Sequence, residues 1–170
     1  MAHLAMLIAQ AYGVHPAVAR QIRTAAALHD VGKLKLPAEL LNKPAKLEPH
    51  EFEVIKTHTV LGAEMLNSIQ GGVGEMARNC CRWHHERFDG SGYWGRRTDD
   101  LPFYVPIISI CDVAVALLSE RPYKEAWPPN ETLEYIKNNA GKQFSPELVE
   151  VFLWTIRNDN RVPAIFTAAL

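Results

Sequence analysis

Residues 84–93 read His84-His85-Glu86-Arg87-Phe88-Asp89-Gly90-Ser91-Gly92-Tyr93. The two histidines close a helical pattern, and the two glycines and the tyrosine belong to the loop that follows. A histidine pair of this kind usually marks only a helix end, and such glycines a turn. Other helical patterns, however, carry His29-Asp30, His58 and Asp112 at their ends or on their faces. Together these side chains form a spaced set of imidazoles and carboxylates, the groups that bind metal ions.

Apolar residues recur at helical spacing through most of the chain. The pattern predicts helices over about residues 2–12, 16–31, 49–70, 73–85, 107–117, 130–140 and 146–156. Three prolines between residues 35 and 49 predict a connecting loop with at most a short turn. We therefore expect residues 1–170 to form one all-α domain, a compact bundle of about six or seven helices.

His29 falls on the buried stripe of the second helix, and Asp30 follows it. Both side chains can reach one ion if the helix end points at it, although a buried His-Asp pair is also compatible with a plain hydrogen-bonded couple. Gly32 is expected to stop the helix. Lys33 then places an ammonium group within a turn of the carboxylate.

Asp112 lies in a helical pattern that is apolar on nearly every side, so this helix is expected to be central. A carboxylate in such a place is costly unless it is paired or bound to metal. His58 lies next to the apolar face of its own helix. Taken alone, this position would indicate a histidine of the core. Together with the other candidates it indicates a metal ligand.

Composition excludes several classes of function. Of 170 residues, 48% are hydrophobic, enough for a sizeable core, and 18 basic residues nearly balance 19 acidic ones. No overall field therefore favours a nucleic acid polymer or an anionic membrane. No apolar run is long enough to span a bilayer. The three cysteines are odd in number and two are adjacent, which favours packing residues in the reducing cytoplasm over disulfides.

Two segments offer groups for an anionic ligand. The loop with Gly92 and Tyr93 can present backbone N–H groups to a phosphate or stack on a base, or it can be a structural turn packed by its aromatic residues. Arg121 and Lys124 lie three residues apart in a second loop and suit phosphate oxygens. A solvated basic pair is an equally good interpretation of those two cations.

The ligand set is larger than one tetrahedral zinc ion needs. Six side chains fit a bridged pair of octahedral ions, and they are His29, Asp30, His58, His84, His85 and Asp112. A pair of ions can activate a hydroxide and hold the oxygens of a phosphoester, so the sequence predicts a phosphohydrolase. Lys33 and Lys124 would offset charge on the phosphoryl group.

At this point the chain resembles a known family. Five separated motifs are similar to those of the HD-GYP domain, a branch of the HD phosphohydrolase superfamily, and occur in its order: residues 25–33, the His58 helix, residues 84–93, the Asp112 helix and residues 121–124. The resemblance extends from the first helix to about Phe152. It implies an all-helical domain that hydrolyses the bacterial second messenger cyclic di-GMP to the linear dinucleotide pGpG or onward to GMP.

The resemblance also implies roles for single residues. It implies a centre of two or three ions, typically iron or manganese, bridged by Asp30. His29 and Asp112 would hold one ion, and His58, His84 and His85 the other. Lys33 would lie close to the attacking hydroxide, and Arg121 and Lys124 would hold substrate phosphate. A regulatory or diguanylate-cyclase-type domain is an expected partner, and a homodimer is plausible.

The sequence departs from the family pattern in three places. Trp94 stands where the motif ends in proline. Val115 stands where a second aspartate is usual, with Ala114 where a tyrosine is common. The family's first ligand, a histidine on the first helix, would fall before Met1, and the uncapped start of the first helix agrees with a helix cut from a longer one.

Two alternatives stay open, and the departures support the first. One is a module that binds cyclic di-GMP or a partner domain without hydrolysing it. The other is a different nucleotide phosphohydrolase of the wider HD superfamily, which His84-His85 and residues 90–93 argue against.

Overall fold

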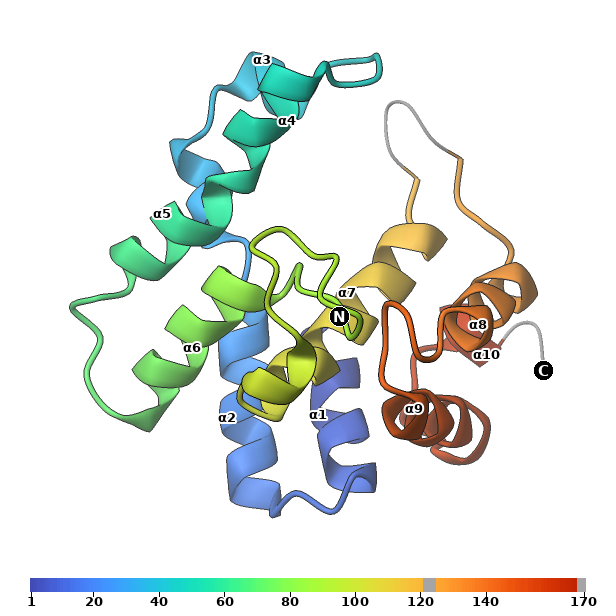
Figure 1. The fold of residues 1–170 in the computed structure, drawn as a ribbon. Helices are drawn as coiled ribbons and strands as arrows, with labels where there is room; N and C mark the ends of the chain where they lie inside the picture. The colour runs from blue at the N-terminus through green and yellow to red at the C-terminus, as the bar shows by residue number, and fades with distance from the viewer. Residues whose placement is uncertain (121–124, 168–170) are drawn as a thin grey trace.

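The chain is all-α in the computed structural model, which describes residues 1–120 and 125–167 (Figure 1). The helices are α1 (Ala2–Ala11), α2 (Pro16–Leu28), η1 (Val31–Lys35, 3₁₀), α3 (Ala38–Leu41), α4 (Pro49–Lys56), α5 (His58–Met65), α6 (Gly72–Trp83), η2 (Thr98–Asp100, 3₁₀), α7 (Tyr104–Leu118), α8 (Pro129–Asn138), α9 (Pro146–Asn158) and α10 (Ala164–Thr167). The predicted fold class is confirmed. With α4 and α5 taken as one interrupted helix, the described residues contain seven helices of at least eight residues, the upper end of the expected number.

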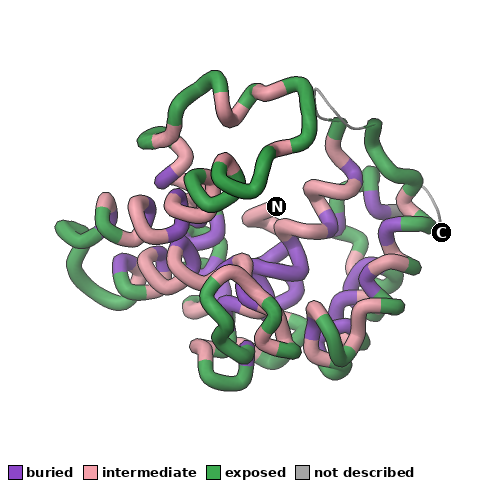
Figure 2. The backbone as a smooth tube through the Cα atoms, turned by 45° about the horizontal axis from the view of Figure 1, so that its top comes forward, coloured by how far each residue is buried: buried purple, intermediate pink, exposed green. Residues whose placement is uncertain are grey.

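Helices α1 and α7 form the centre of the bundle. Residues 4–9 of α1 are all buried, and nine of the fifteen residues of α7 are buried, because both helices are apolar nearly all round. Helix α1 packs against α2, α7 and α9. The buried part of the backbone trace runs through these central helices, while α3 and α4 project from the body (Figures 1 and 2).

A second group of contacts joins the elements that carry the candidate ligands. Helix α2 packs on α6, α6 packs on α5 and α7, and η1 packs on α5. Cys80 and Cys81 are buried free thiols in α6, and Cys111 is a buried free thiol in α7. Their interpretation as packing residues is confirmed.

The predicted long helix from residue 49 to 70 is interrupted at Thr57. Three consecutive side chains there donate to backbone carbonyls three residues earlier: Thr57 Oγ1 to Val54, His58 Nδ1 to Ile55 and Thr59 Oγ1 to Lys56, at 2.6, 2.7 and 2.9 Å. Side chains that bond to nearby carbonyls compete with the helical ladder. The interruption turns His58 into the first residue of α5.

The second helix also ends earlier than predicted. It stops at Leu28, and Gly32 lies inside η1 instead of ending the helix. A Cβ atom on Gly32 would overlap the carbonyl oxygen of His58 and lie 2.5 Å from the amide nitrogen of Gly62. Glycine at this position therefore allows the backbone of η1 to touch α5.

Across the described residues, we find no helix with the length and apolar character needed to cross a membrane.

Candidate metal centre

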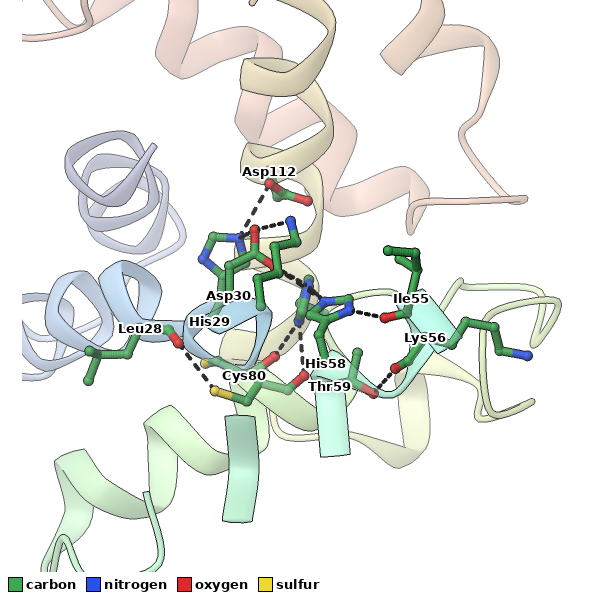
Figure 3. Close-up of polar contacts among 12 residues, drawn as sticks. Leu28, His29, Asp30, Ile55, Lys56, His58, Thr59, Cys80 and Asp112 are labelled. Atoms are coloured by element: carbon green, nitrogen blue, oxygen red, sulfur yellow. Dashed lines mark hydrogen bonds and ion pairs between the residues drawn. The ribbon is translucent and has the colours of Figure 1, made fainter. Parts of the chain in front are cut away.

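The six predicted ligands come from four helices whose ends or sides meet at one place. His29 caps the C-terminus of α2 and Asp30 follows it, while His58 begins α5. His84 caps the C-terminus of α6, His85 is the next residue, and Asp112 projects from the middle of α7. Figure 3 shows Asp112 and His29 facing each other, with Asp30 between His29 and His58.

The carboxylate of Asp30 lies at the centre of the cluster. Its Oδ1 atom is 3.2 Å from His58 Nε2 and 3.6 Å from His84 Nε2. Its Oδ2 atom is 3.3 Å from His29 Nε2. The two oxygens of one carboxylate therefore face different imidazoles, two at Oδ1 and one at Oδ2.

These contacts define two sets of ligand atoms. One set takes one atom each from Asp30, His58, His84 and His85, and the second takes one each from His29, His84 and Asp112. Within each set the atoms lie within 4.8 Å of one another. His29 Nε2 is 3.4 Å from Asp112 Oδ1, which ties the second set to Asp30 through His29.

Backbone carbonyls orient three of the imidazoles. The Nδ1 atoms of His29, His58 and His84 lie 2.8, 2.7 and 2.8 Å from the carbonyl oxygens of Ala26, Ile55 and Cys80. Each contact places the proton on Nδ1 and leaves the lone pair of Nε2 pointing into the cluster. Metal-binding histidines are held in the same way by a bond from their other ring nitrogen.

The buried polar atoms of the cluster match a metal centre. His29 Nε2 and Asp30 Oδ1 are buried and have no hydrogen-bond partner within the described protein. Buried polar atoms normally have a hydrogen-bond partner, so these two atoms remain available to donate electron pairs to a metal ion. Imidazole nitrogens and carboxylate oxygens in this number suit divalent metal ions.

The electrostatics of the cluster also favour a cation. Burial lowers the pKa of His29, but the carboxylates of Asp112 and Asp30 beside the ring outweigh burial and raise it to about 9. Burial raises the pKa of Asp30, but the imidazoles of His29, His58 and His84 beside the carboxylate outweigh burial and hold it far below its usual value. The carboxylates thus favour a positive charge between them, which either a proton on His29 or a bound cation supplies.

His84 and His85 stay neutral. Burial is the main cause that lowers the pKa of His84, and burial with the neighbouring His84 lowers the pKa of His85 to about 2. A neutral imidazole is the form that binds a metal ion. At neutral pH the cluster therefore offers ionised carboxylates and two neutral imidazoles.

Lys33 is placed where the sequence predicted it. Its Nζ atom lies 2.5 Å from Asp30 Oδ2, on the same side of the carboxylate as His29. The ammonium group is about one-third exposed. It is therefore able to contact both the carboxylate and a molecule that enters the site.

The loop after His85 is fastened to the cluster by Glu86, which the sequence analysis did not single out. Glu86 is buried, and its two carboxylate oxygens accept the backbone N–H groups of Trp94 and Arg96 at 2.7 and 2.6 Å. A Cβ atom on Gly92 would lie 2.5 Å from Glu86 Cα and 2.7 Å from the carbonyl oxygen of His85. Gly92 therefore serves close packing of the loop, and its φ is not positive.

Tyr93 covers one side of the cluster. Its ring lies 4.4 Å from the ring of His85 and 5.5 Å from Phe52 of α4, centroid to centroid. A cavity of about 280 Å³ opens beside these residues and is also lined by Lys56 and His84. Burial is the main cause that raises the pKa of Tyr93 to about 12, so its hydroxyl keeps its proton at neutral pH.

The structure thus brings nine of the predicted site residues to one region: the six candidate ligands, Lys33, Gly92 and Tyr93. Arg121 and Lys124 lie outside the described residues. Phe52, Lys56 and Glu86 border the site but were missed. The only signal for Glu86 is its position beside the histidine pair, because a single sequence does not distinguish a buried acid in a loop from an exposed one.

Comparison with protein families agrees with this geometry. A model of the HD domain matches residues 1–148. The chain belongs to the HD domain family. Residues 1–148 of this HD domain include every candidate ligand named above, and the resemblance to HD-GYP domains is confirmed.

Relatives of this HD domain have been described in several bacteria. It is 40% identical over 154 residues to the cyclic di-GMP phosphodiesterase response regulator RpfG of Xanthomonas campestris, covering 90% of this chain and 41% of RpfG. It is 38% identical to a cyclic di-GMP phosphodiesterase of Thermotoga maritima, covering 86% and 40% of the two chains. It is 37% identical to the 3′3′-cGAMP-specific phosphodiesterase 2 of Vibrio cholerae, covering 86% and 28%. The chain therefore spans less than half of each relative.

A solved structure shares the fold of this HD domain. Bd1817, an HDG"Y"P protein from Bdellovibrio bacteriovorus, superposes with a TM-score of 0.72 at 18% identity, over 92% of this chain and 50% of that one. The similarity of fold supports the arrangement of helices around the cluster.

Proposed function

We propose that this HD domain is a metal-dependent phosphodiesterase that hydrolyses cyclic di-GMP to pGpG, to GMP or to both in bacterial signal transduction. The observation that carries the proposal is the position of Asp30. Its Oδ1 atom faces His58 and His84 and its Oδ2 atom faces His29, as expected of a residue that bridges a pair of ions. The names of the relatives supply the substrate class.

The proposed ligands are the six residues of the cluster. Asp30 would bridge the ions, His29 and Asp112 would hold one, and His58, His84 and His85 the other; His84 lies within reach of both sets. Iron and manganese are the proposed metals, with a third ion as a further possibility of the same site. When bound, the ions would supply a hydroxide of lowered pKa and a positive field for the phosphoryl oxygens.

The remaining residues would bind and orient the substrate. Lys33 donates to Asp30 and is the proposed catalytic cation beside the attacked phosphate. Gly92 and Tyr93 form the wall of the cavity next to His85 and would contact the dinucleotide. Arg121 and Lys124 remain proposed contacts of its phosphates.

Residues 1–170 are proposed to be one domain of a signalling protein in the cytoplasm, with a regulatory or diguanylate-cyclase-type domain or a second copy as partner. Trp94 in place of the family's proline favours a second candidate, a module that binds cyclic di-GMP without hydrolysing it. The two candidates differ only in turnover.

The test is hydrolysis by protein purified without oxygen and loaded with ferrous iron or manganese. The substrates are cyclic di-GMP, 3′3′-cGAMP and a set of mononucleotides, and the products are separated by chromatography. Preferential turnover of cyclic di-GMP that is lost in Asp30→Ala supports the proposal. Tight binding of intact cyclic di-GMP by metal-loaded protein supports the binding module, and preferential turnover of 3′3′-cGAMP would reassign the substrate.

A further inference from the structure

Trp94 makes contacts that a proline at this position could not make. Its backbone N–H donates to Glu86 Oε1 at 2.7 Å, a bond that proline lacks because it has no N–H. Its indole Nε1–H donates to Thr59 Oγ1 at 3.1 Å. The backbone and the side chain of Trp94 therefore fasten the loop at two separate points.

Thr59 connects this loop to the candidate metal centre. It is fully buried and follows His58 directly in α5. Its hydroxyl accepts from the indole of Trp94 and donates to the carbonyl oxygen of Lys56 at 2.9 Å. A continuous chain of hydrogen bonds thus runs from the loop into the helix interruption that orients His58.

Two cationic side chains also lie near the ring of Trp94. Lys56 Nζ lies 5.7 Å from the ring centre of Trp94, and the guanidinium carbon of Arg82 lies 5.3 Å from it. Both distances are within the range of a cation–π attraction. Lys56 also lies 5.8 Å from the ring centre of Tyr93, so it bridges the two neighbouring aromatic residues of the loop.

We propose that Trp94 is a positioning residue, and that its hydrogen bond to Thr59 fixes the loop so that Tyr93 stays against His85. In this chain the hydrogen bond from the Trp94 side chain would hold the loop in place. In HD-GYP domains whose motif ends in proline, the fixed φ angle of that proline would have this role. The inference rests on the proposed function in one respect, because it requires Tyr93 to contact the substrate. The anchor itself lies outside the ligand set and acts through Tyr93.

The test uses variants that remove either end of the bond. Trp94→Phe removes the indole N–H and keeps an aromatic ring near Lys56 and Arg82. Thr59→Val removes the hydroxyl with little change in shape. Thr59→Ser keeps the hydroxyl and is the conservative rescue. Trp154→Phe changes an exposed tryptophan of α9 and is the control. Far-UV circular dichroism and manganese content are measured for each variant to establish that fold and metal are retained.

The first readout is steady-state kinetics with cyclic di-GMP. Loss of one hydrogen bond should raise KM by about three- to tenfold in Trp94→Phe and Thr59→Val, with kcat little changed. The double variant should be no worse than Thr59→Val, because that single variant already removes the bond to Trp94 together with the bond to Lys56. Thr59→Ser and Trp154→Phe should behave like the wild-type protein.

The second readout is independent of activity. Amide hydrogen exchange over residues 86–97 should be faster by about threefold or more in Trp94→Phe and unchanged in Trp154→Phe. If the wild-type protein does not turn over cyclic di-GMP, the proposed function fails while exchange still decides the anchor. Unchanged exchange in Trp94→Phe, or KM effects that add up in the double variant, would overturn the inference.

Discussion

The Nε2 atoms of His58 and His84 lie 3.4 Å apart, although the Nδ1 proton of each ring is directed at a backbone carbonyl. Each Nε2 therefore presents a lone pair to the other, with Asp30 Oδ1 beside both. Three electron-rich atoms in one buried place repel one another unless a positive charge lies among them.

Metal should stabilise the folded protein. Manganese at about 100 times its dissociation constant should add about 2.7 kcal/mol to the free energy of unfolding of chelator-treated protein, because the cluster exists only in the folded chain. For a chain of this size, Tm should rise by about 5–10 °C in a thermal melt. Equal Tm values with and without manganese would contradict a site built from these residues.

Asp30→Asn should prevent metal binding while keeping the shape of the side chain. The carboxylate lies among three imidazoles and an ammonium group, and a neutral amide does not offset bound cations there. Metal content measured by mass spectrometry should fall to a small fraction of the wild-type value. Asp100→Asn, at an exposed position, is the control and should retain its metal.

Lys33→Met should reduce turnover more than metal binding. The ammonium group contacts one oxygen of Asp30 and is about one-third exposed, so it can also lie beside a bound substrate. Its main effect is therefore expected on negative charge that develops on the substrate. We expect kcat to fall by about a hundredfold with metal content retained. Lys35→Met changes a neighbouring exposed lysine and should leave kcat unchanged. Parallel losses of metal and activity in Lys33→Met would show instead that Lys33 organises Asp30.

Gly32→Ala should destabilise the fold. The added Cβ would meet backbone atoms of His58 and Gly62 in α5. Backbone atoms cannot move aside as the end of a flexible side chain can. Forced overpacking of this kind costs about 2 kcal/mol, which corresponds to a fall in Tm of about 4–8 °C. Gly72→Ala is the matched control because its Cβ would meet nothing within 4 Å. Equal Tm values for the two variants would contradict the close approach of η1 to α5.

The three cysteines should react slowly with thiol reagents in the folded protein. Burial is the main cause that raises the pKa of Cys81 to about 12 and the pKa values of Cys80 and Cys111 above their usual range. The reactive form is the thiolate, so little of it exists at pH 8. Labelling with a disulfide reagent should become rapid for all three only in denaturant. Rapid labelling of the native protein would show that α6 or α7 opens readily.

Much of the site was predictable because its residues stand out against their surroundings. Asp112 in an apolar helix and His29 on a buried stripe are anomalies that a sequence displays by itself. The adjacent His84 and His85 at a helix end were the third signal of this kind. Helical periodicity was sufficient for the fold class because every long helix has an apolar face.

The features that were not predictable depend on side-chain bonds to the backbone. The apolar pattern continues across Thr57, so periodicity alone predicted one helix where carbonyl bonds from residues 57–59 produce two. Likewise, the role of Glu86 depends on the amides of Trp94 and Arg96, eight and ten residues later in the chain. Such contacts follow from the folded path of a loop and leave no periodic signal.

The most direct test of the metal centre is the number of manganese ions that the chain binds at saturation, measured by mass spectrometry together with electron paramagnetic resonance. Asp30 belongs to one ligand set and contacts His29 of the other, which predicts a pair of ions per chain with the spectrum of a magnetically coupled pair. A single uncoupled ion, or none, in protein that is folded by circular dichroism would contradict the bridging position assigned to Asp30.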